Sequence, residues 1–293
     1  MIKTQGKAAY VVPAAPAASA APEMTLTYQE PIRDMPLVED AELEWKLCLA
    51  GIPAALALGV LFHFLMPGVQ RIFFSMPVHE LGHAASAWLC GHWAVPFLWK
   101  TAWGEERGLV TPLLLLGGFS FLIYLGWAKE QTILIVLGAL GIAVQALGTL
   151  VLKPKVAISM IVFGGDGMGM VIATGLMASF FFGKDTQLYK GSLRWGFLVI
   201  GAAAFVDLSA TWFASLSDFA RVPFGEQEGG LLSDATRLVD EHDWETRAMI
   251  RRHVGVALSC LGALAAVYGW GVWQARAATI TSSEAGRRSS RPA

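Results

Sequence analysis

Three residues with the spacing of a metal site lie within residues 69–90, which read VQRIFFSMPVHELGHAASAWLC. His79 and His83 are four residues apart, so on a helix both rings lie on one face and can bind the same ion. Glu80 is beside them, and it can accept a proton from a water molecule whose pKa zinc lowers toward about 7. The motif therefore predicts a Zn²⁺ site with His79 and His83 as ligands and Glu80 as general base.

A catalytic zinc site usually has a third protein ligand, and an apolar segment near residue 166 offers one. Asp166 stands in the run VFGGDGMGMV, where the glycines would let the backbone approach a metal ion closely. An ionisable residue inside an apolar segment is costly and indicates a function. We predict Asp166 as the third ligand, with Asp207, in AAFVDLSATW, as the alternative.

Each of these assignments has a structural alternative. His79, Glu80 and His83 could form a polar cluster that packs helices together. Asp166 could be a turn residue between two shorter apolar segments. Asp207 could be hydrogen-bonded to Ser209, to Thr211 or to a neighbouring helix. The four other histidines stand near the ends of predicted spans, where an interfacial role is expected, namely His63, His92, His242 and His253.

The elements that would carry these residues are membrane helices. Of 293 residues, 55% are hydrophobic and only 15% are charged, so the chain falls outside the usual soluble class. The net charge of -1 gives no basic surplus for binding a nucleic acid. Apolar runs of spanning length predict an all-α polytopic bundle of about six to seven transmembrane helices. The candidate spans are 47–66, 69–90, 109–127, 131–152, 156–182, 192–215 and 254–275.

The polar segments divide the chain further. Residues 1–45 are Ala- and Pro-rich and predict a flexible tail, and 46–215 would form the membrane-embedded core. The connector 216–253 predicts an amphipathic helix near 231–252, ahead of the last span at 254–275, and 276–293 predicts a disordered tail. The excess of Lys and Arg on one side favours a cytoplasmic N-terminus. Cys48, Cys90 and Cys260 are too scattered for a disulfide framework and predict buried small side chains.

The stretch from His79 to Gly91 resembles the active-site helix of site-2-protease-type intramembrane zinc metalloproteases, and Asp166-Gly167 is similar to the Asp-Gly pair that supplies their third ligand. The resemblance implies cleavage of membrane protein substrates within or next to a transmembrane segment, in a lipid bilayer, here a bacterial inner membrane. It also implies a short β-rich, membrane-associated stretch near residues 92–110. The sequence has Gly165 where the family usually has Leu. Seven full crossings would also make the Asp166 helix antiparallel to the motif helix, whereas the family has them parallel, so either one span is not a full crossing or Asp207 is the ligand.

Two other functions remain open from the sequence. One is a non-proteolytic membrane protein that uses the His/Asp site for metal sensing, transport or structure. The other is a protease whose third ligand is a glutamate of the 216–253 connector, with Glu226, Glu228 and Glu241 as candidates. The substrate and the oligomeric state are not predicted.

Overall fold

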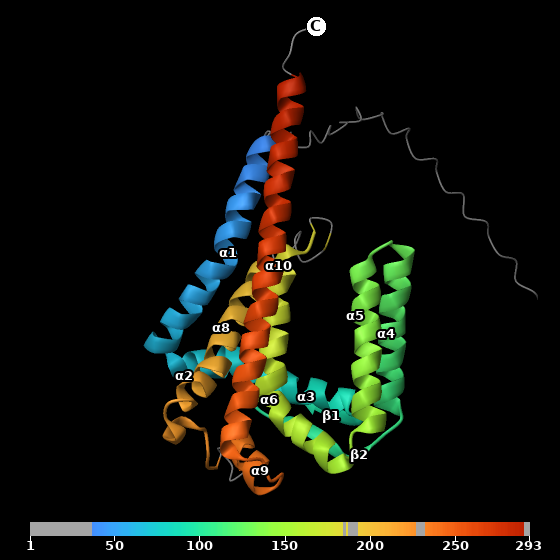
Figure 1. Ribbon diagram of the computed structural model, residues 1–293, viewed down its shortest axis with the longest axis vertical. Coiled ribbons are helices and arrows are strands. Elements are labelled where there is room, and N and C mark those ends of the chain that lie inside the picture. Colours follow the sequence, from blue (N-terminus) through green and yellow to red (C-terminus); the bar gives the residue numbers. More distant parts are fainter. Residues whose placement is uncertain (1–36, 184–185, 187–192, 227–231, 290–293) are drawn as a thin grey trace, which may run out of the picture. The chain divides into compact units, whose positions relative to one another are not determined.

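The computed structural model describes residues 37–183, 186, 193–226 and 232–289. These residues are mostly helical, with one small sheet among them (Figure 1). In chain order the elements are α1 (Leu37–Leu65), α2 (Pro67–Gln70), the π-helical turn η1 (Arg71–Ser75), α3 (Met76–Leu89), β1 (His92–Pro96), β2 (Thr101–Arg107), α4 (Val110–Ala128), α5 (Thr132–Ala146), η2 (Leu147–Val151), α6 (Pro154–Ala178), η3 (Ser179–Phe181), α8 (Leu193–Ser215), η4 (Phe219–Arg221), α9 (Asp234–Asp240) and α10 (Thr246–Ser289).

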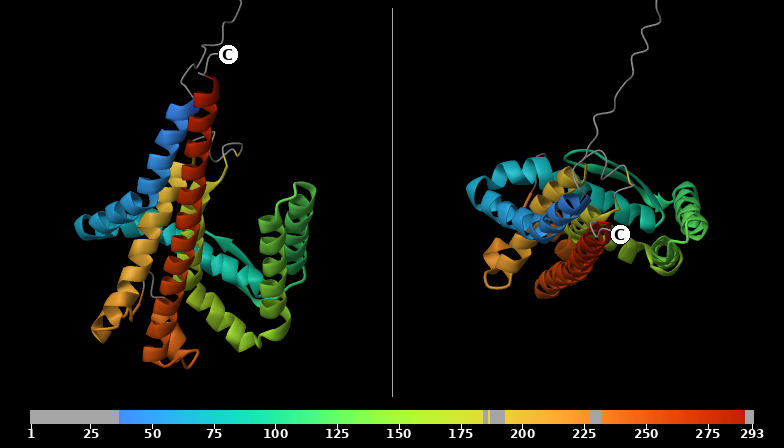
Figure 2. Two further views of the ribbon diagram at one scale, coloured as in Figure 1. Left: turned by 45° about the horizontal axis from the view of Figure 1, so that its top comes forward. Right: turned by 90° about the horizontal axis from the view of Figure 1, so that it is seen from above.

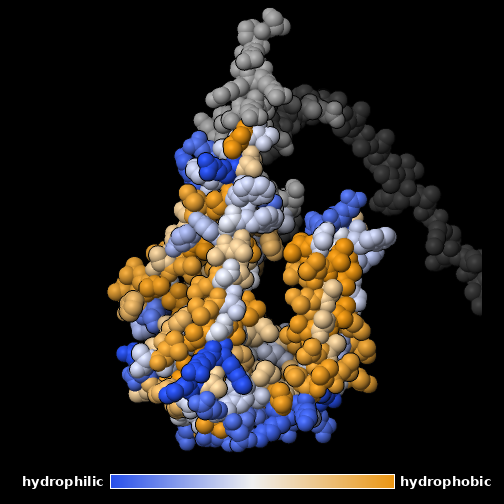
Figure 3. Space-filling model, in the orientation of Figure 1, coloured by the Kyte–Doolittle hydropathy of each residue, from blue (hydrophilic) through white to orange (hydrophobic). Residues whose placement is uncertain are grey.

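Six of these helical stretches are long and apolar enough to cross a membrane, which confirms the predicted all-α polytopic fold. They are Ala41–Leu65, Val110–Ala128, Thr132–Val151, Pro154–Phe181, Leu193–Ser215 and Thr246–Thr281. Large apolar side chains point outward from them, including Phe64, Leu114 and Leu150, which are 78%, 71% and 80% exposed. Figure 3 shows this apolar surface over most of the helical body, with hydrophilic side chains gathered below it. Such a surface suits lipid and not water.

The predicted span 69–90 is not one of the six. Its residues belong to the continuous helical stretch of α2, η1 and α3, which carries Arg71, His79, Glu80 and His83 and is not among the helices long and apolar enough to cross a membrane. Helix α3 ends at Leu89, and Gly91, with a positive φ of 87°, turns the chain into β1. Figures 1 and 2 show α3 lying across the long helices and not alongside them. One of the seven predicted spans is therefore not a full crossing.

Helix α6 is the centre of the packing. It contacts α3, α8 and α10, while α1 packs on the outer side of α8 and α10. The largest apolar cluster joins these helices through fully buried residues such as Met170, Met177 and Leu208. Helices α4 and α5 pack mainly on each other, and Figure 1 shows this pair apart from the α1, α8 and α10 group. The three cysteines are buried, as predicted.

The predicted β-rich stretch is a hairpin. β1 and β2 pair antiparallel, with Ala94 opposite Trp103 and Pro96 opposite Thr101. The hairpin packs on α3, and the Trp88 indole donates a hydrogen bond of 3.0 Å to the Ala94 carbonyl. The hairpin is thereby fixed against the helix that carries the histidine motif.

The ends of the chain and the connector differ from the prediction. Helix α1 already begins at Leu37, inside the predicted tail, where the buried Arg194 guanidinium binds the Glu44 carboxylate at 2.6 and 3.1 Å. Helix α10 continues beyond Arg276 to Ser289, and Thr279 Oγ1 donates to the Ala41 carbonyl of α1. The rest of the predicted tails, 1–36 and 290–293, lies outside the described residues.

The predicted amphipathic helix at 231–252 is also divided. The chain leaves the helical region at Asp243, with φ of 58°, so a short α9 precedes α10. The apolar face of that helix was expected to include Leu231, Ala235 and Leu238. Ala235 and Leu238 are buried, whereas Leu231 lies outside the described residues. Helix α9 thus docks on the bundle despite its length of only 7 residues.

The crossing of α3 and α6 is a contact between glycine backbones. A Cβ at Gly82 would clash with the carbonyl oxygen of Gly164 and would lie 2.7 Å from both the Gly165 oxygen and the Gly169 nitrogen. On the other side, a Cβ at Gly164 would clash with the Ser86 side chain. Side chains at these positions would push the two helices apart, as in close membrane helix crossings generally.

We expect Gly82→Ala to lower the thermal unfolding temperature in detergent, because overpacking of this kind costs about 1–3 kcal/mol. Gly175→Ala on α6 is the matched control, since a Cβ there meets nothing within 4 Å and alanine is the better helix former. Equal unfolding temperatures for the two variants would contradict the close crossing.

Candidate metal centre

The two motif histidines lie side by side on the face of α3 that meets α6. Their ring centroids are 4.6 Å apart and their Nε2 atoms 3.1 Å apart. Both residues are buried, with 5% and 4% exposure. A Cβ on Gly165 of α6 would lie 2.6 Å from His83 Nε2 and 2.7 Å from His79 Nε2. Gly165 therefore leaves room for the His79 and His83 rings, at a position where the family that the sequence resembles usually has Leu.

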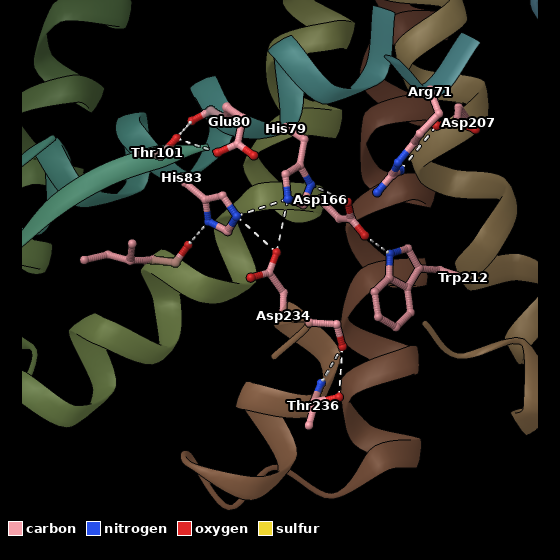
Figure 4. A network of polar contacts seen from close by, with 12 residues as sticks. Arg71, His79, Glu80, His83, Thr101, Asp166, Asp207, Trp212, Asp234 and Thr236 are labelled. Carbon is pink, nitrogen blue, oxygen red and sulfur yellow. Dashed lines mark hydrogen bonds and ion pairs between the residues drawn. The ribbon is translucent and has the colours of Figure 1, made fainter. Parts of the chain in front are cut away.

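The third group at this point is Asp234, the first residue of α9, which the sequence did not single out. Its Oδ2 atom lies 3.1 Å from His79 Nε2 and 3.0 Å from His83 Nε2 (Figure 4). Three ligand atoms around a tetrahedral zinc, with bonds of about 2.0–2.1 Å, are about 3.3 Å apart. The triangle of 3.0–3.1 Å is close to that size, and in the described part of the chain these three residues form the group able to hold a metal ion.

Asp166 lies on the other side of His79. Its Oδ1 atom is 2.8 Å from His79 Nδ1, and its Oδ2 accepts a hydrogen bond of 2.7 Å from the Trp212 indole. The Nε2 atom of His79 points instead to His83 and Asp234. Asp166 is thus in the position of a carboxylate that orients a ligand histidine and fixes its tautomer.

The outer partner of His83 has the same effect. His83 Nδ1 lies 2.8 Å from the carbonyl oxygen of Ile161, which can only accept, so this nitrogen carries a proton. With both Nδ1 atoms acting as donors, the neutral rings present Nε2 lone pairs to each other and to the Asp234 carboxylate. Three acceptors within about 3 Å of one another repel unless a proton is shared between them or a metal ion lies among them. The arrangement suits a metal ion.

Asp207 is separate from this centre. It is buried, and its carboxylate binds Arg71 Nη1 at 3.2 Å and lies 3.3 Å from His63 Nδ1. This arrangement matches the alternative in which Asp207 pairs with a neighbouring element. Of the connector glutamates, Glu241 pairs with Arg237 and Glu226 forms a β-bridge with Leu232, while Glu228 lies outside the described residues. The connector does supply a carboxylate, but it comes from Asp234.

Glu80 is buried beside the two rings. Figure 4 shows its carboxylate between the histidines and Thr101. Thr101 Oγ1, at the start of β2, lies 2.7 Å from Glu80 Oε2 and 2.7 Å from the Glu80 carbonyl oxygen. The hairpin therefore holds the Glu80 carboxylate, which is not directed at the three converging atoms of His79, His83 and Asp234.

A cavity of about 50 Å³ opens beside the metal centre. Its polar lining includes Arg71, His79, Asp166, Asp234 and His253. Burial alone would raise the pKa of the Asp234 carboxyl, but in the metal-free protein the facing His83 and His79 outweigh burial when they are protonated, and they hold this pKa well below its usual range. Asp234 is therefore ionised, as a ligand must be.

Helix α9 brings Asp234 to the centre by ordinary packing. Ser233 caps the helix by accepting a hydrogen bond of 3.3 Å from the Thr236 amide. Ala235 and Leu238 then bury against Val162, Trp212 and Ile250 of α6, α8 and α10. The buried face of α9 thus fixes the position of the carboxylate one residue before it.

We expect the purified protein to bind close to one zinc ion per chain, with the three carboxylates differing in effect. Asp234→Asn removes a ligand and should abolish stoichiometric binding. Asp166→Asn should keep the site but weaken zinc affinity about 10–100-fold, the usual effect of losing an orienting partner. Asp207→Asn is the matched buried control and should bind like the wild type. Metal content and competition with a chelator measure all three, and loss with Asp166→Asn but retention with Asp234→Asn would reverse the ligand assignment.

No family model, curated protein or solved structure matches the chain. Its function is therefore inferred from its own residues and their contacts.

Proposed function

We propose that this chain is a zinc-dependent endopeptidase that cleaves membrane protein substrates within or next to a transmembrane segment. His79, His83 and Asp234 would hold the zinc ion and Glu80 would act as general base. A bacterial inner membrane and a cytoplasmic N-terminus belong to the same proposal. The observation that carries it is the convergence of two imidazole nitrogens and a carboxylate oxygen at 3.0–3.1 Å, next to a buried glutamate outside the triangle.

The zinc ion, when bound, would polarise the scissile carbonyl and make a water molecule acidic. Glu80 would accept the proton of that water and later deliver it to the leaving amine. Thr101 would hold the Glu80 carboxylate in place through the 2.7 Å contact. Arg71, on the wall of the adjoining cavity, brings a positive charge near the position where negative charge develops on the substrate.

The surroundings of the site favour a membrane substrate over a soluble one. The motif helix packs against α6, one of the six candidate spans. A second, apolar cavity of about 540 Å³ lies between α5 and α6 and reaches Ser86 and Gly164 at the α3 crossing. A segment entering there would be apolar, and it would have to unwind locally before hydrolysis because a helix shields its own peptide bonds.

The non-proteolytic alternative uses the same ligands but has no need for a general base. A buried carboxylate that is held by Thr101 and is not directed at the metal ligands is costly unless it has a function. This observation favours hydrolysis over sensing, transport or a structural metal.

We expect Glu80→Gln to abolish cleavage of a model transmembrane substrate while the variant keeps its zinc, because the amide has almost the same shape but cannot accept the proton. The measurement pairs zinc content with substrate cleavage in detergent or liposomes. A Glu80→Gln variant that still cleaves would rule out the assigned role. A wild type that holds zinc but cleaves no membrane substrate would favour the non-proteolytic function.

Thr101→Val should lower kcat about tenfold with little change in KM, since one hydrogen bond to a charged group is lost at the base and not at the substrate. Thr186→Val is a control on an exposed threonine hydroxyl away from the centre. A Thr101→Val enzyme as active as the control would show that the hairpin does not position Glu80.

A further inference from the structure

A large groove runs between α6 and α10 on the lipid-facing side of the bundle. Its volume is about 1070 Å³, and most of its wall is apolar, with Val156, Met160, Val171, Val256 and Ala263 among the lining residues. Both helices are candidate membrane spans. The groove is thus formed within the part of the fold that faces the hydrocarbon chains of lipids.

One end of this groove is basic. Lys153 and Lys155 stand at the first turn of α6, and Arg252 stands in the second turn of α10. Lys155 Nζ binds Asp243 Oδ2 at 2.6 Å, and the Arg252 guanidinium lies 4.1 Å from the Trp244 ring centroid. Glu241 beside His242 pairs with Arg237, and Asp243 pairs with Lys155, so Lys153 and Arg252 leave this end positively charged. Figure 3 shows the hydrophilic side chains gathered at this lower end of the molecule, below the apolar helices.

His242, in the turn between α9 and α10, also lines this end of the groove. Both of its ring nitrogens are buried, and within the described residues neither has a hydrogen-bond partner. A buried polar atom without a partner is costly. Because both nitrogens are enclosed by protein atoms, His242 forms part of the wall of the groove and offers no ring nitrogen to a ligand.

We propose that this groove is a binding site for one anionic phospholipid. The acyl chains lie along the apolar walls of α6 and α10. The phosphate lies at the basic end, where the exposed Lys153 and Arg252 bind it. Basic pockets between membrane helices recognise anionic lipid headgroups through this combination of charge and apolar depth. The groove contains none of the three candidate metal ligands, and lipid binding there does not depend on the proposed protease function, although the groove shares Met160, Phe163, Val171 and Val256 with the apolar cavity between α5 and α6.

The size and charge of the groove favour a lipid over a substrate helix. A transmembrane helix about 10 Å across and 30 Å long fills roughly 2400 Å³, more than twice the groove. A helix also has no fixed negative charge for the basic end. The two acyl chains and phosphate of a phospholipid match both features.

The test compares phosphatidylglycerol with phosphatidylcholine of the same acyl chains, added to detergent-purified full-length protein and followed by native mass spectrometry. The wild type should retain one phosphatidylglycerol in preference to phosphatidylcholine. The Lys153→Gln, Arg252→Gln double variant should weaken phosphatidylglycerol binding about 30-fold, because two cations near the headgroup are lost. The Lys100→Gln, Lys129→Gln double variant is the control with the same change in net charge away from the groove, and it should keep the preference.

A second variant tests the apolar part without touching the charges. Ala263→Trp fills the groove and should reduce retention of both lipids, whereas Ala265→Trp, an exposed position on the same helix that does not line the groove, should not. No lipid preference in the wild type, or the same preference in both double variants, would overturn the proposal. So would protection by inorganic phosphate alone in thermal unfolding, or recovery of a bound peptide in place of lipid.

Discussion

The metal centre depends on the close crossing of two helices through their glycines. Because Gly82 meets the backbone of Gly164 and Gly165, α3 can lie directly on α6, and its histidines then face a backbone without side chains. Helix α3 is stabilised by this packing and by the hairpin, since most helical stability in proteins comes from tertiary contacts.

The fold also decides which atoms of the histidines are available. Ile161 and Asp166, both on α6, bind the two Nδ1 atoms at 2.8 Å, so α6 orients both rings from behind. The Nε2 atoms are then directed to the side from which α9 approaches. Helix α6 thus forms the wall of the site and positions the rings, and α9 completes the ligand set. Two aspartates thus contact His79 in different ways. Asp166 of α6 contacts Nδ1 and orients the ring, whereas Asp234 of α9 lies near Nε2 and is the proposed ligand.

Hydropathy and residue spacing predicted the membrane class and the histidine motif, because both have local signals, whereas the hairpin was expected only from the family resemblance. The sequence did not predict that residues 69–90 lie crosswise, since an apolar helical pattern does not specify the direction of a helix. It also did not single out Asp234. A lone aspartate in a polar connector has no signal of its own, and the glycine pattern drew attention to Asp166. The apolar residues Ala235 and Leu238 were the signal in the sequence that could have indicated Asp234. A helix with an apolar face packs on the bundle, and the first residue of that helix then comes close to the bundle.

The proposed ligand on α9 would make the candidate metal centre dependent on a segment outside the six spans. Asp234 begins a helix of 7 residues whose position comes from apolar contacts with α6, α8 and α10, with Trp212 and Ile250 fully buried among them. Trp212 also donates to Asp166, so one side chain supports both the outer partner of His79 and the docking of α9. If the proposed ligand set is right, displacement of α9 would remove a ligand and open the adjoining cavity in the same movement. Metal binding would then be linked to the position of this connector, because an ion that binds all three residues would stabilise the docked form of α9 by its own binding free energy.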